Sequence, residues 1–274
     1  MNGVKELALA LFGPGLLMIA PSNFTEDRKV KKAIRKLPRS RREMLFFGKF
    51  FGRERYCPLC QSQVRLFLPH GNTRKRPNAW CPGCGSLERH RLAWIALEQK
   101  TNLYAPFEKS LLHIAPEPGL RDKLRNLSHL DYLSADLSYL GAMVKMDITD
   151  IQYPHNTFDI IYCNNVLEHI PNDRQAMREF YRVLKSNGFA LLMVPVTREK
   201  TFEDPSVTDP AERVRLFGQA DHVRHYGPDF KDRLEDSGFS TRTFTAGDIV
   251  GENDTFRFGM QNPYDIVFLC SKSV

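Results

Sequence analysis

Residues 158–196 read FDIIYCNNVLEHIPNDRQAMREFYRVLKSNGFALLMVPV, and this stretch decides the fold. The apolar runs at 158–163 and 189–196 predict two strands that are covered on both faces, as in a parallel sheet. Apolar residues between the runs recur at helical spacing and give one buried helix face. These residues are Ala176, Met177, Phe180, Val183 and Leu184.

The ends of this helix also have sequence signals. Asn172 or Asp173 can accept the first free backbone N–H groups of the helix. Asn187-Gly188 predicts a left-handed stop before the second strand. Two strands joined through a helix form a right-handed βαβ unit, so we expect an open sheet with helices on both faces.

The residues of this stretch resemble those of a known family. FDIIYCNNVLEHIPND and RVLKSNG are similar to the acidic-strand, LEH-turn and RVLKPGG-type segments of class I S-adenosylmethionine-dependent methyltransferases, of the methyltransferase-11-like kind. The resemblance covers residues 111–196 and implies an α/β, Rossmann-like seven-stranded domain over residues 108–274. The alternative is another doubly wound α/β domain.

Four of the six cysteines form two Cys-x-x-Cys pairs: Cys57, Cys60, Cys81 and Cys84. The spacing C-x2-C-x20-C-x2-C is typical of a closed four-thiolate zinc site, which leaves no open position for catalysis. We therefore expect a structural zinc ribbon with its linking helix at 56–100, in a reducing compartment. Free cysteines or two disulfides are the alternative. Ser86 is predicted to cap the linking helix, which runs to Lys100.

The net charge of +7 is unevenly distributed. Residues 28–55 contain twelve Lys or Arg against two Glu, a local balance of +10, so the rest of the chain sums to about −3. This basic stretch has aromatic residues between its charges. Binding to RNA is one interpretation, and a solvated face with an apolar stripe is the other.

The chain begins with an apolar segment at residues 7–20 that Gly13-Pro14-Gly15 interrupts. A signal peptide is one interpretation, but Glu6 weakens the positive region that it requires. Peripheral membrane contact by the arm at 1–55 is a second, and packing on its own domain or on a partner subunit is the third. No run is long enough for a transmembrane helix, and we expect a cytoplasmic protein, with membrane association as an alternative.

The segment LLHIAPEPG at 111–119 aligns with the strand and glycine-rich turn that bind the cofactor in the resembled family. His113 stands at the usual acidic position, Ala115 and Glu117 stand where glycines are expected, and Gly119 fits the pattern. Glu117 could meet the ammonium group of the cofactor, or it could be a turn residue that points to water. The glycine turn of the family is therefore altered here.

Further cofactor residues follow from the resemblance. Asp136 ends a predicted strand at 130–135 and matches the position that binds the ribose hydroxyls. Asp147 is placed beside the adenine amino group. Asn164 is placed in the cofactor or acceptor pocket. A helix cap is the alternative role for each aspartate.

His169, His222 and His225 are candidate general bases, because the unperturbed pKa of histidine lies near neutrality. The Glu-His pair at His169 is common in family members with unrelated substrates, which favours a structural or cofactor-side role. His222 and His225 lie in a long polar segment after Val196, where the family inserts substrate-recognition elements. Strands at 241–245 and 264–271 are predicted to pair antiparallel at the sheet edge.

The resemblance implies a transferase that uses S-adenosylmethionine. A small-molecule or glycan acceptor is favoured, because the catalytic domain itself is not basic. An RNA methyltransferase that uses the arm and the ribbon, and a cofactor-binding protein without transferase activity, are the alternatives. The sequence does not decide the oligomeric state.

Overall fold

The structure is a computed structural model, and it describes residues 50–71, 75–138 and 141–272. The expectations for the N-terminal arm at 1–55 therefore fall almost wholly outside the described residues. RNA binding or membrane contact by the arm stays a prediction. Within the described part of the chain, no helix is both long and apolar enough to cross a membrane.

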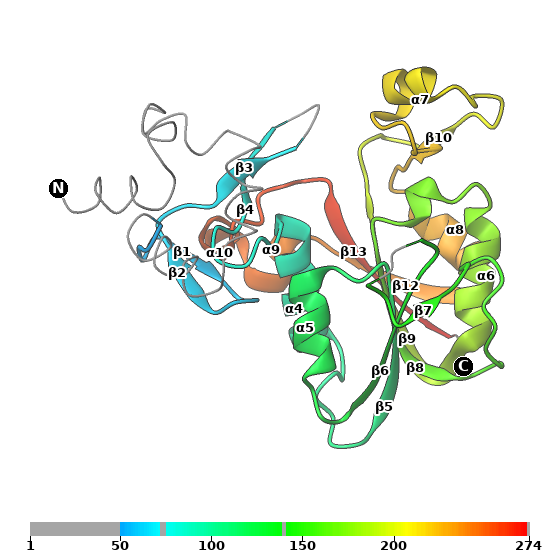
Figure 1. Ribbon diagram of the computed structural model, residues 1–274, viewed down its shortest axis with the longest axis horizontal. Coiled ribbons are helices and arrows are strands. Elements are labelled where there is room, and N and C mark those ends of the chain that lie inside the picture. Colours follow the sequence, from blue (N-terminus) through cyan, green and yellow to red (C-terminus); the bar gives the residue numbers. More distant parts are fainter. Residues whose placement is uncertain (1–49, 72–74, 139–140, 273–274) are drawn as a thin grey trace.

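A seven-stranded sheet forms the centre of the molecule, in the order β12-β13-β9-β8-β5-β6-β7 (Figure 1). Only β13 runs against its two neighbours, and the other pairs are parallel. This topology confirms the expected α/β, Rossmann-like seven-stranded fold. The strands are β5 (Lys109–Ile114), β6 (Leu130–Asp136), β7 (Val144–Lys145), β8 (Phe158–Asn164), β9 (Leu184–Pro195), β12 (Phe239–Phe244) and β13 (Asp265–Lys272).

Helices cover both faces of the sheet. Successive strand residues face opposite sides, so Leu111 packs in one hydrophobic cluster and Leu112 in the other. The first cluster holds α4 (Glu88–Lys100), α5 (Pro118–Arg125) and α9 (Ala246–Val250). The second holds α6 (Asp173–Val183) and α8 (Phe230–Asp236). The sheet therefore lies between two layers of helices, which explains why the runs at 158–163 and 189–196 are apolar on both faces.

The central βαβ unit forms as predicted, with one correction. Asn172 caps α6, because its side chain accepts a hydrogen bond from the backbone N–H of Gln175 at 3.1 Å. The helix ends at Val183 rather than at Asn187-Gly188, and β9 begins at once. Gly188 serves close strand packing instead, since a Cβ there would lie 2.6 Å from the carbonyl oxygen of Asp159.

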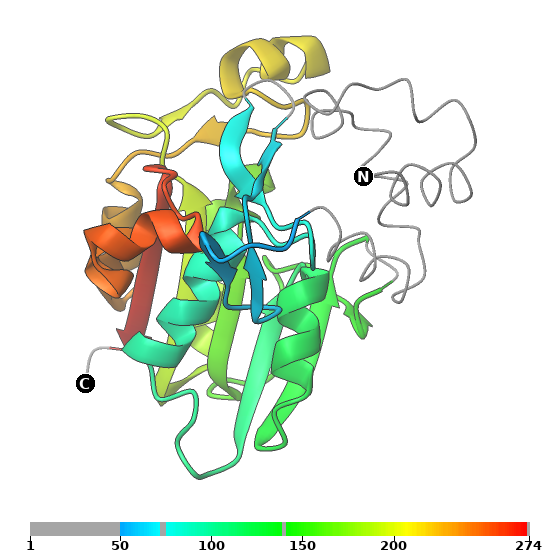
Figure 2. The ribbon, with the colours of Figure 1, turned by 90° about the vertical axis from the view of Figure 1, so that its left-hand side faces the viewer.

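Two short hairpins precede the sheet and contain the four paired cysteines. Strands β1 (Arg55–Cys57) and β2 (Ser62–Val64) pair antiparallel, as do β3 (Leu68–His70) and β4 (Arg76–Trp80). Their apolar side chains belong to the same hydrophobic cluster as one face of the sheet. The hairpins therefore pack directly on the α/β layer (Figure 2).

Helix α4 joins the hairpins to the sheet and is buried nearly all round, from Leu92 to Leu97. A helix that is covered on all sides lies within a core. Ser86 does not cap it. The Ser86 hydroxyl instead lies 3.2 Å from the sulfur of Cys84 and 3.4 Å from that of Cys57.

The chain after β12 adds two helices that the sequence pattern did not reveal, α9 and α10 (Glu252–Phe258). They hold the hairpins through the guanidinium of Arg91, which is fully buried. Arg91 donates hydrogen bonds to the carbonyls of Phe258 at 2.7 Å and Gly259 at 2.8 Å. It also donates to carbonyls of the hairpin region, those of Asn78, Ala79 and Ser86.

Residues 197–226 form a cap beside the carboxyl ends of the central strands. The cap contains α7 (Pro210–Phe217) and the paired strands β10 (Phe202–Glu203) and β11 (Arg224–His225). It is joined to the short helix η2 (Leu167–His169), which follows β8, by the backbone N–H of Val223 donating to the carbonyl of Glu168 at 3.0 Å. Figure 1 shows the cap beyond α6 and α8.

Replacing Arg91 with Met should destabilise the whole protein, because five carbonyls lose a buried cationic donor at once. Unpaired buried acceptors cost about 1–3 kcal/mol each, so we expect a loss of at least about 3 kcal/mol in the free energy of unfolding. Arg174→Met is the matched control. It removes a solvent-exposed pair with Asp236 and should cost less than about 1 kcal/mol. Urea unfolding measures both, and equal losses would contradict the role of Arg91.

Candidate cofactor, metal and acceptor sites

The carboxyl ends of the parallel strands meet at one edge of the sheet. Ala115 follows β5, Asp136 ends β6, Met146 follows β7 and Asn164 ends β8. Ligands of open α/β sheets bind outside such carboxyl ends. The topology therefore brings together the cofactor residues that the sequence placed on separate segments.

The turn after β5 keeps a glycine-like backbone without the glycine. Ala115 has φ of 50°, a left-handed conformation that side chains rarely adopt. Its N–H donates to the carbonyl of Ala135 at 2.8 Å, which ties the turn to β6. Gly119, in the first turn of α5, would meet no protein atom within 4 Å if it carried a Cβ. The turn thus leaves open space beside Gly119.

Glu117 occupies the other expected glycine position, and its carboxylate makes hydrogen-bond contacts with three side chains. Its carboxylate lies 2.9 Å from the ring Nε2 of His113 and accepts from the Asn164 amide at 2.9 Å and the Tyr162 hydroxyl at 3.3 Å. Burial opposes ionisation, but the hydrogen bond to His113 and the nearby His90 lower the pKa of Glu117 to about 2. Glu117 is therefore a fixed negative charge rather than a turn residue that points to water.

His113 supports this charge from inside the core. It is fully buried, and its Nδ1 lies 2.9 Å from the hydroxyl of Tyr132. Its ring also packs edge-on against Tyr162, with centroids 4.8 Å apart. Both ring nitrogens of His113 thus contact protein groups, and His113 reaches a ligand only through Glu117.

Polar atoms around Glu117 lack partners among the described residues. They are Nε2 of His90 and Oδ1 of Asn164, and Nε of Arg89, the residue before His90, is also buried without a partner. Nε2 of His90 lies 3.7 Å from the Glu117 carboxylate. Burial and the charge of Arg89 lower the pKa of His90 to about 3, so the ring is neutral at pH 7. Unpartnered buried polar atoms mark a place where a polar ligand can bind.

Arg89 and His90 come from the start of α4, directly after the cysteine hairpins. The sequence analysis did not identify either residue as part of the site. The Arg-His pair at this helix start is visible in the sequence, but no spacing rule links positions 89 and 90 to position 117. Only the packing of α4 on the sheet brings them together.

The two candidate aspartates lie at the same edge, each in a local turn. One carboxylate oxygen of Asp136 accepts from the N–H of Ser138 at 2.8 Å. Asp147 accepts from both the N–H and the hydroxyl of Thr149, at 2.8 and 2.7 Å, and these bonds lower its pKa. Asp147 also lines a cavity of about 430 Å³, together with Leu137 and Met146. Neither aspartate caps a helix.

The structure brings two of the three candidate histidines together. The rings of His169 and His222 pack edge to face with centroids 4.6 Å apart. His225 lies apart from them, with its Nδ1 2.8 Å from the hydroxyl of Thr197. Glu168, which the sequence analysis did not single out, is buried beside this pair, and burial raises its pKa to about 7.

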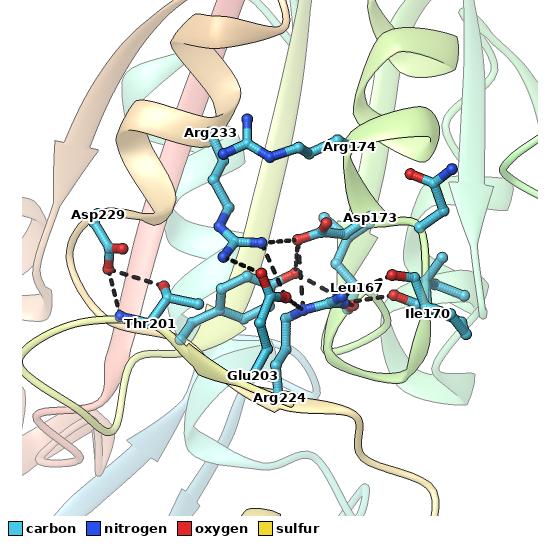
Figure 3. Close-up of polar contacts among 12 residues, drawn as sticks. Leu167, Ile170, Asp173, Arg174, Thr201, Glu203, Arg224, Asp229 and Arg233 are labelled. Atoms are coloured by element: carbon cyan, nitrogen blue, oxygen red, sulfur yellow. Dashed lines mark hydrogen bonds and ion pairs between the residues drawn. The ribbon is translucent and has the colours of Figure 1, made fainter. Parts of the chain in front are cut away.

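A network of charges fastens the cap to the start of α6 (Figure 3). Arg224 and Arg233 both hold Glu203, each at 2.7 Å, and Arg233 also reaches Asp173 at 3.0 Å. Arg224 donates further to the carbonyls of Leu167, Ile170 and Pro171. Tyr226 completes the network by donating to Asp173 at 2.7 Å. Arg224 and Tyr226 are thus structural residues of the cap.

The four paired cysteines converge where the turn between β1 and β2 meets the turn after β4, and all four sulfurs lie within 4.8 Å of one another. Cys57 and Cys84 have their sulfurs 3.7 Å apart, and Cys60 and Cys81 have theirs 3.8 Å apart. A disulfide would need about 2.05 Å. Zn–S bonds of about 2.3 Å at tetrahedral angles place sulfurs about 3.8 Å apart, so the geometry fits a four-thiolate zinc ion.

Acid should weaken the attachment of the cap. Burial opposes ionisation of Glu203, but hydrogen bonds from Arg233 and Arg224 lower its pKa to about 2. A lowered pKa stabilises the folded state above the unfolded value, near 4.5, and this contribution is lost as pH falls toward 2. Glu203→Gln should therefore reduce the free energy of unfolding at pH 6, with a smaller difference from wild type at pH 3. Urea unfolding at both values measures this, and a pH-independent difference would contradict it.

Comparison with known proteins agrees with the resemblance. Residues 101–192 match the family model described as a methyltransferase domain. Phosphoethanolamine N-methyltransferase 3 of Arabidopsis thaliana is 33% identical over 113 residues, which cover 41% of this chain and 20% of that protein. The 2-methyl-6-phytyl-1,4-hydroquinone methyltransferase 1 of Oryza sativa subsp. japonica is 39% identical over 54 residues, 20% of this chain and 16% of that protein. The chain thus spans about a fifth or less of these relatives' length.

Solved structures with a similar fold include methyltransferases. The 1,6-didemethyltoxoflavin-N1-methyltransferase of Burkholderia thailandensis, solved with S-adenosylhomocysteine, is 11% identical with a TM-score of 0.47, covering 68% of this chain and 79% of that one. A putative methyltransferase of Bacillus halodurans is 18% identical with a TM-score of 0.44, covering 67% and 99%. The residues that match the methyltransferase-domain family begin just after α4 and end within β9, so they form much of the Rossmann-like sheet. This match supports a methyltransferase.

Proposed function

We propose that this protein is a methyltransferase that uses S-adenosylmethionine and modifies a small-molecule or glycan acceptor. The observation that carries the proposal is the ring of buried, unpartnered polar atoms around the ionised Glu117, at the carboxyl ends of β5 and β8. S-adenosylmethionine would supply an electrophilic methyl group on a sulfonium ion. The chain's own residues bind and orient it.

The methionine end of the cofactor fits the Glu117 region by charge. A carboxylate offers about four acceptor positions, and three side chains already contact that of Glu117. The negative charge of Glu117 would attract the cofactor's ammonium group beside these side chains. Arg89, whose Nε lacks a partner, supplies the positive charge that a cofactor carboxylate requires.

The nucleoside end fits the neighbouring strands. The Asp136 carboxylate, at the end of β6, would accept hydrogen bonds from the ribose hydroxyls. The cavity beside Asp147, which Leu137 and Met146 also line, would take the adenine ring between apolar side chains. Asn164, at the end of β8, would turn its unpartnered carbonyl oxygen toward the donor groups of the cofactor.

The acceptor would bind between this edge and the cap, beside His169 and His222. Catalysis of methyl transfer depends mainly on holding two reactants in line. His222 is buried and burial lowers its pKa to about 4, so its ring is neutral at pH 7. Outside residues 28–55 the chain carries a net charge of about −3, and we therefore favour a small molecule or a glycan over RNA.

Zinc is proposed for the four-cysteine site as a structural ion. All four positions of a tetrahedral ion would be filled by Cys57, Cys60, Cys81 and Cys84, so the ion would hold the hairpins together and take no part in the reaction. The Ser86 hydroxyl beside two of the sulfurs would orient those ligands. Because α4 starts two residues later, zinc would also fix the position of Arg89 and His90.

Replacing Asp136 should weaken cofactor binding without unfolding the protein. Two hydrogen bonds from a ribose diol to a carboxylate contribute about 1.5–3 kcal/mol, so Asp136→Ala should reduce the affinity for S-adenosylmethionine by about 10–100-fold. Calorimetric titration measures this. Asp131→Ala, on an exposed position of the same strand, should bind as wild type does, and unchanged affinity in Asp136→Ala would refute the ribose assignment.

Removing one zinc ligand should remove the metal and stability together. Cys81→Ser should lose one bound zinc per chain, and it should destabilise the fold because the hairpins share a core with the sheet. Cys270→Ala, at a buried cysteine of β13 far from the cluster in sequence, should keep its zinc. Elemental analysis and thermal unfolding of both variants test this. A stable, metal-free wild-type protein would contradict the zinc site.

A further inference from the structure

A second group of metal-ligating side chains lies where the cap meets η2. Glu168 and His169 come from η2, and His222 comes from the loop that precedes β11. One carboxylate oxygen of Glu168 and one ring nitrogen of each histidine lie within 4.8 Å of one another. These residues belong neither to the cysteine cluster nor to the ring of atoms around Glu117.

Glu168 has an unpartnered oxygen in this group. The residue is only 2% exposed, and its Oε2 has no hydrogen-bond partner among the described residues. Burying a carboxylate oxygen without a partner costs free energy, and a bound cation removes that cost. The cluster therefore contains a possible ligand atom, Oε2 of Glu168, that no described residue contacts by a hydrogen bond.

The hydrogen bonds of the two histidines leave Nε2 of each as an acceptor. Nδ1 of His222 lies 3.1 Å from the carbonyl of Phe217, so Nδ1 carries the proton. Its Nε2 then accepts a hydrogen bond from the side-chain amide of Gln219 at 2.8 Å. The Gln219 side chain is long and can move away. Nδ1 of His169 lies 3.3 Å from the carboxylate of Asp221. An acceptor on the opposite ring nitrogen is the usual support of a metal-bound histidine.

We propose that Glu168, His169 and His222 bind a divalent first-row transition metal ion. Two imidazoles and one carboxylate suit such ions, whereas Mg²⁺ and Ca²⁺ prefer oxygen ligands throughout. Ligands about 2.1 Å from a metal lie about 3.3 Å apart, so the side chains must rotate inward slightly and Gln219 must release His222. Three protein ligands leave positions open for an outside ligand.

The position of this site gives it a role at the acceptor. Glu168 lies four residues beyond Asn164, at the same edge of the sheet as the proposed cofactor site, while His222 belongs to the cap. A metal ion here would join the cap to the end of β8. Its open positions would take an oxygen of the acceptor, such as a hydroxyl or a phosphate. This role rests on the proposed function, but the metal site itself does not.

The test uses the full-length protein with one zinc ion per chain, checked by elemental analysis so that only the cysteine site is filled. Mn²⁺ is the probe, because it binds nitrogen and oxygen ligands and competes poorly for thiolates. Electron paramagnetic resonance of free Mn²⁺ measures binding to wild type, Glu168→Gln, His222→Ala and His225→Ala. His225→Ala is the matched control, a histidine of the same segment outside the cluster. Thermal unfolding without Mn²⁺ checks that each variant is folded.

We expect one Mn²⁺ per chain, with affinity at least about 100-fold weaker in Glu168→Gln and in His222→Ala and unchanged in His225→Ala. Absence of binding to wild type, or equal binding by all four proteins, would overturn the proposal. If His222→Ala does not fold, Glu168→Gln alone decides. Titration with S-adenosylmethionine in the absence of Mn²⁺ keeps the two proposals separate, because it reports on the Glu117 site alone.

Discussion

Burying the carboxylate of Glu117 at the end of β5 obliges the neighbouring strands to supply hydrogen-bond partners, because an unpaired charge there would cost several kcal/mol. Tyr162 and Asn164 from β8 supply two of them, and His113 from β5 supplies the third. The same edge carries the altered turn in which Ala115 adopts a glycine-like backbone. Charge therefore replaces the close backbone approach that a glycine-rich turn would allow.

The cysteine hairpins matter to this edge because they determine where α4 begins. The helix is buried between the hairpins and the sheet, and Arg91 ties it to carbonyls of both the hairpin region and the chain after α10. His90, on the first turn, thereby reaches Glu117. A module that would otherwise be a separate structural unit is thus part of the wall of the proposed cofactor site.

The cap is fastened in a different way, by charges rather than by apolar packing alone. Glu203 and Asp173 hold Arg224 and Arg233 in a partly buried network, and a hydrogen bond joins Val223 to Glu168. These contacts keep the loop that carries His222 against η2.

The sequence by itself determined the fold and the grouping of the four paired cysteines. The strand-helix-strand pattern at 158–196 and the paired cysteines are local signals, because strand periodicity, helix capping and ligand spacing act over a few residues. It also placed Asp136 and Asn164 at strand ends and Glu117 in the turn that follows β5. It misplaced the end of α6, since Gly188 is required by close contact with Asp159 on the neighbouring strand and not by a helix stop. Only the tertiary structure brought His90 to Glu117, paired His169 with His222 and placed His225 against Thr197. Those contacts join elements far apart in the chain, and no local pattern records which distant side chain will supply the partner of a buried polar group.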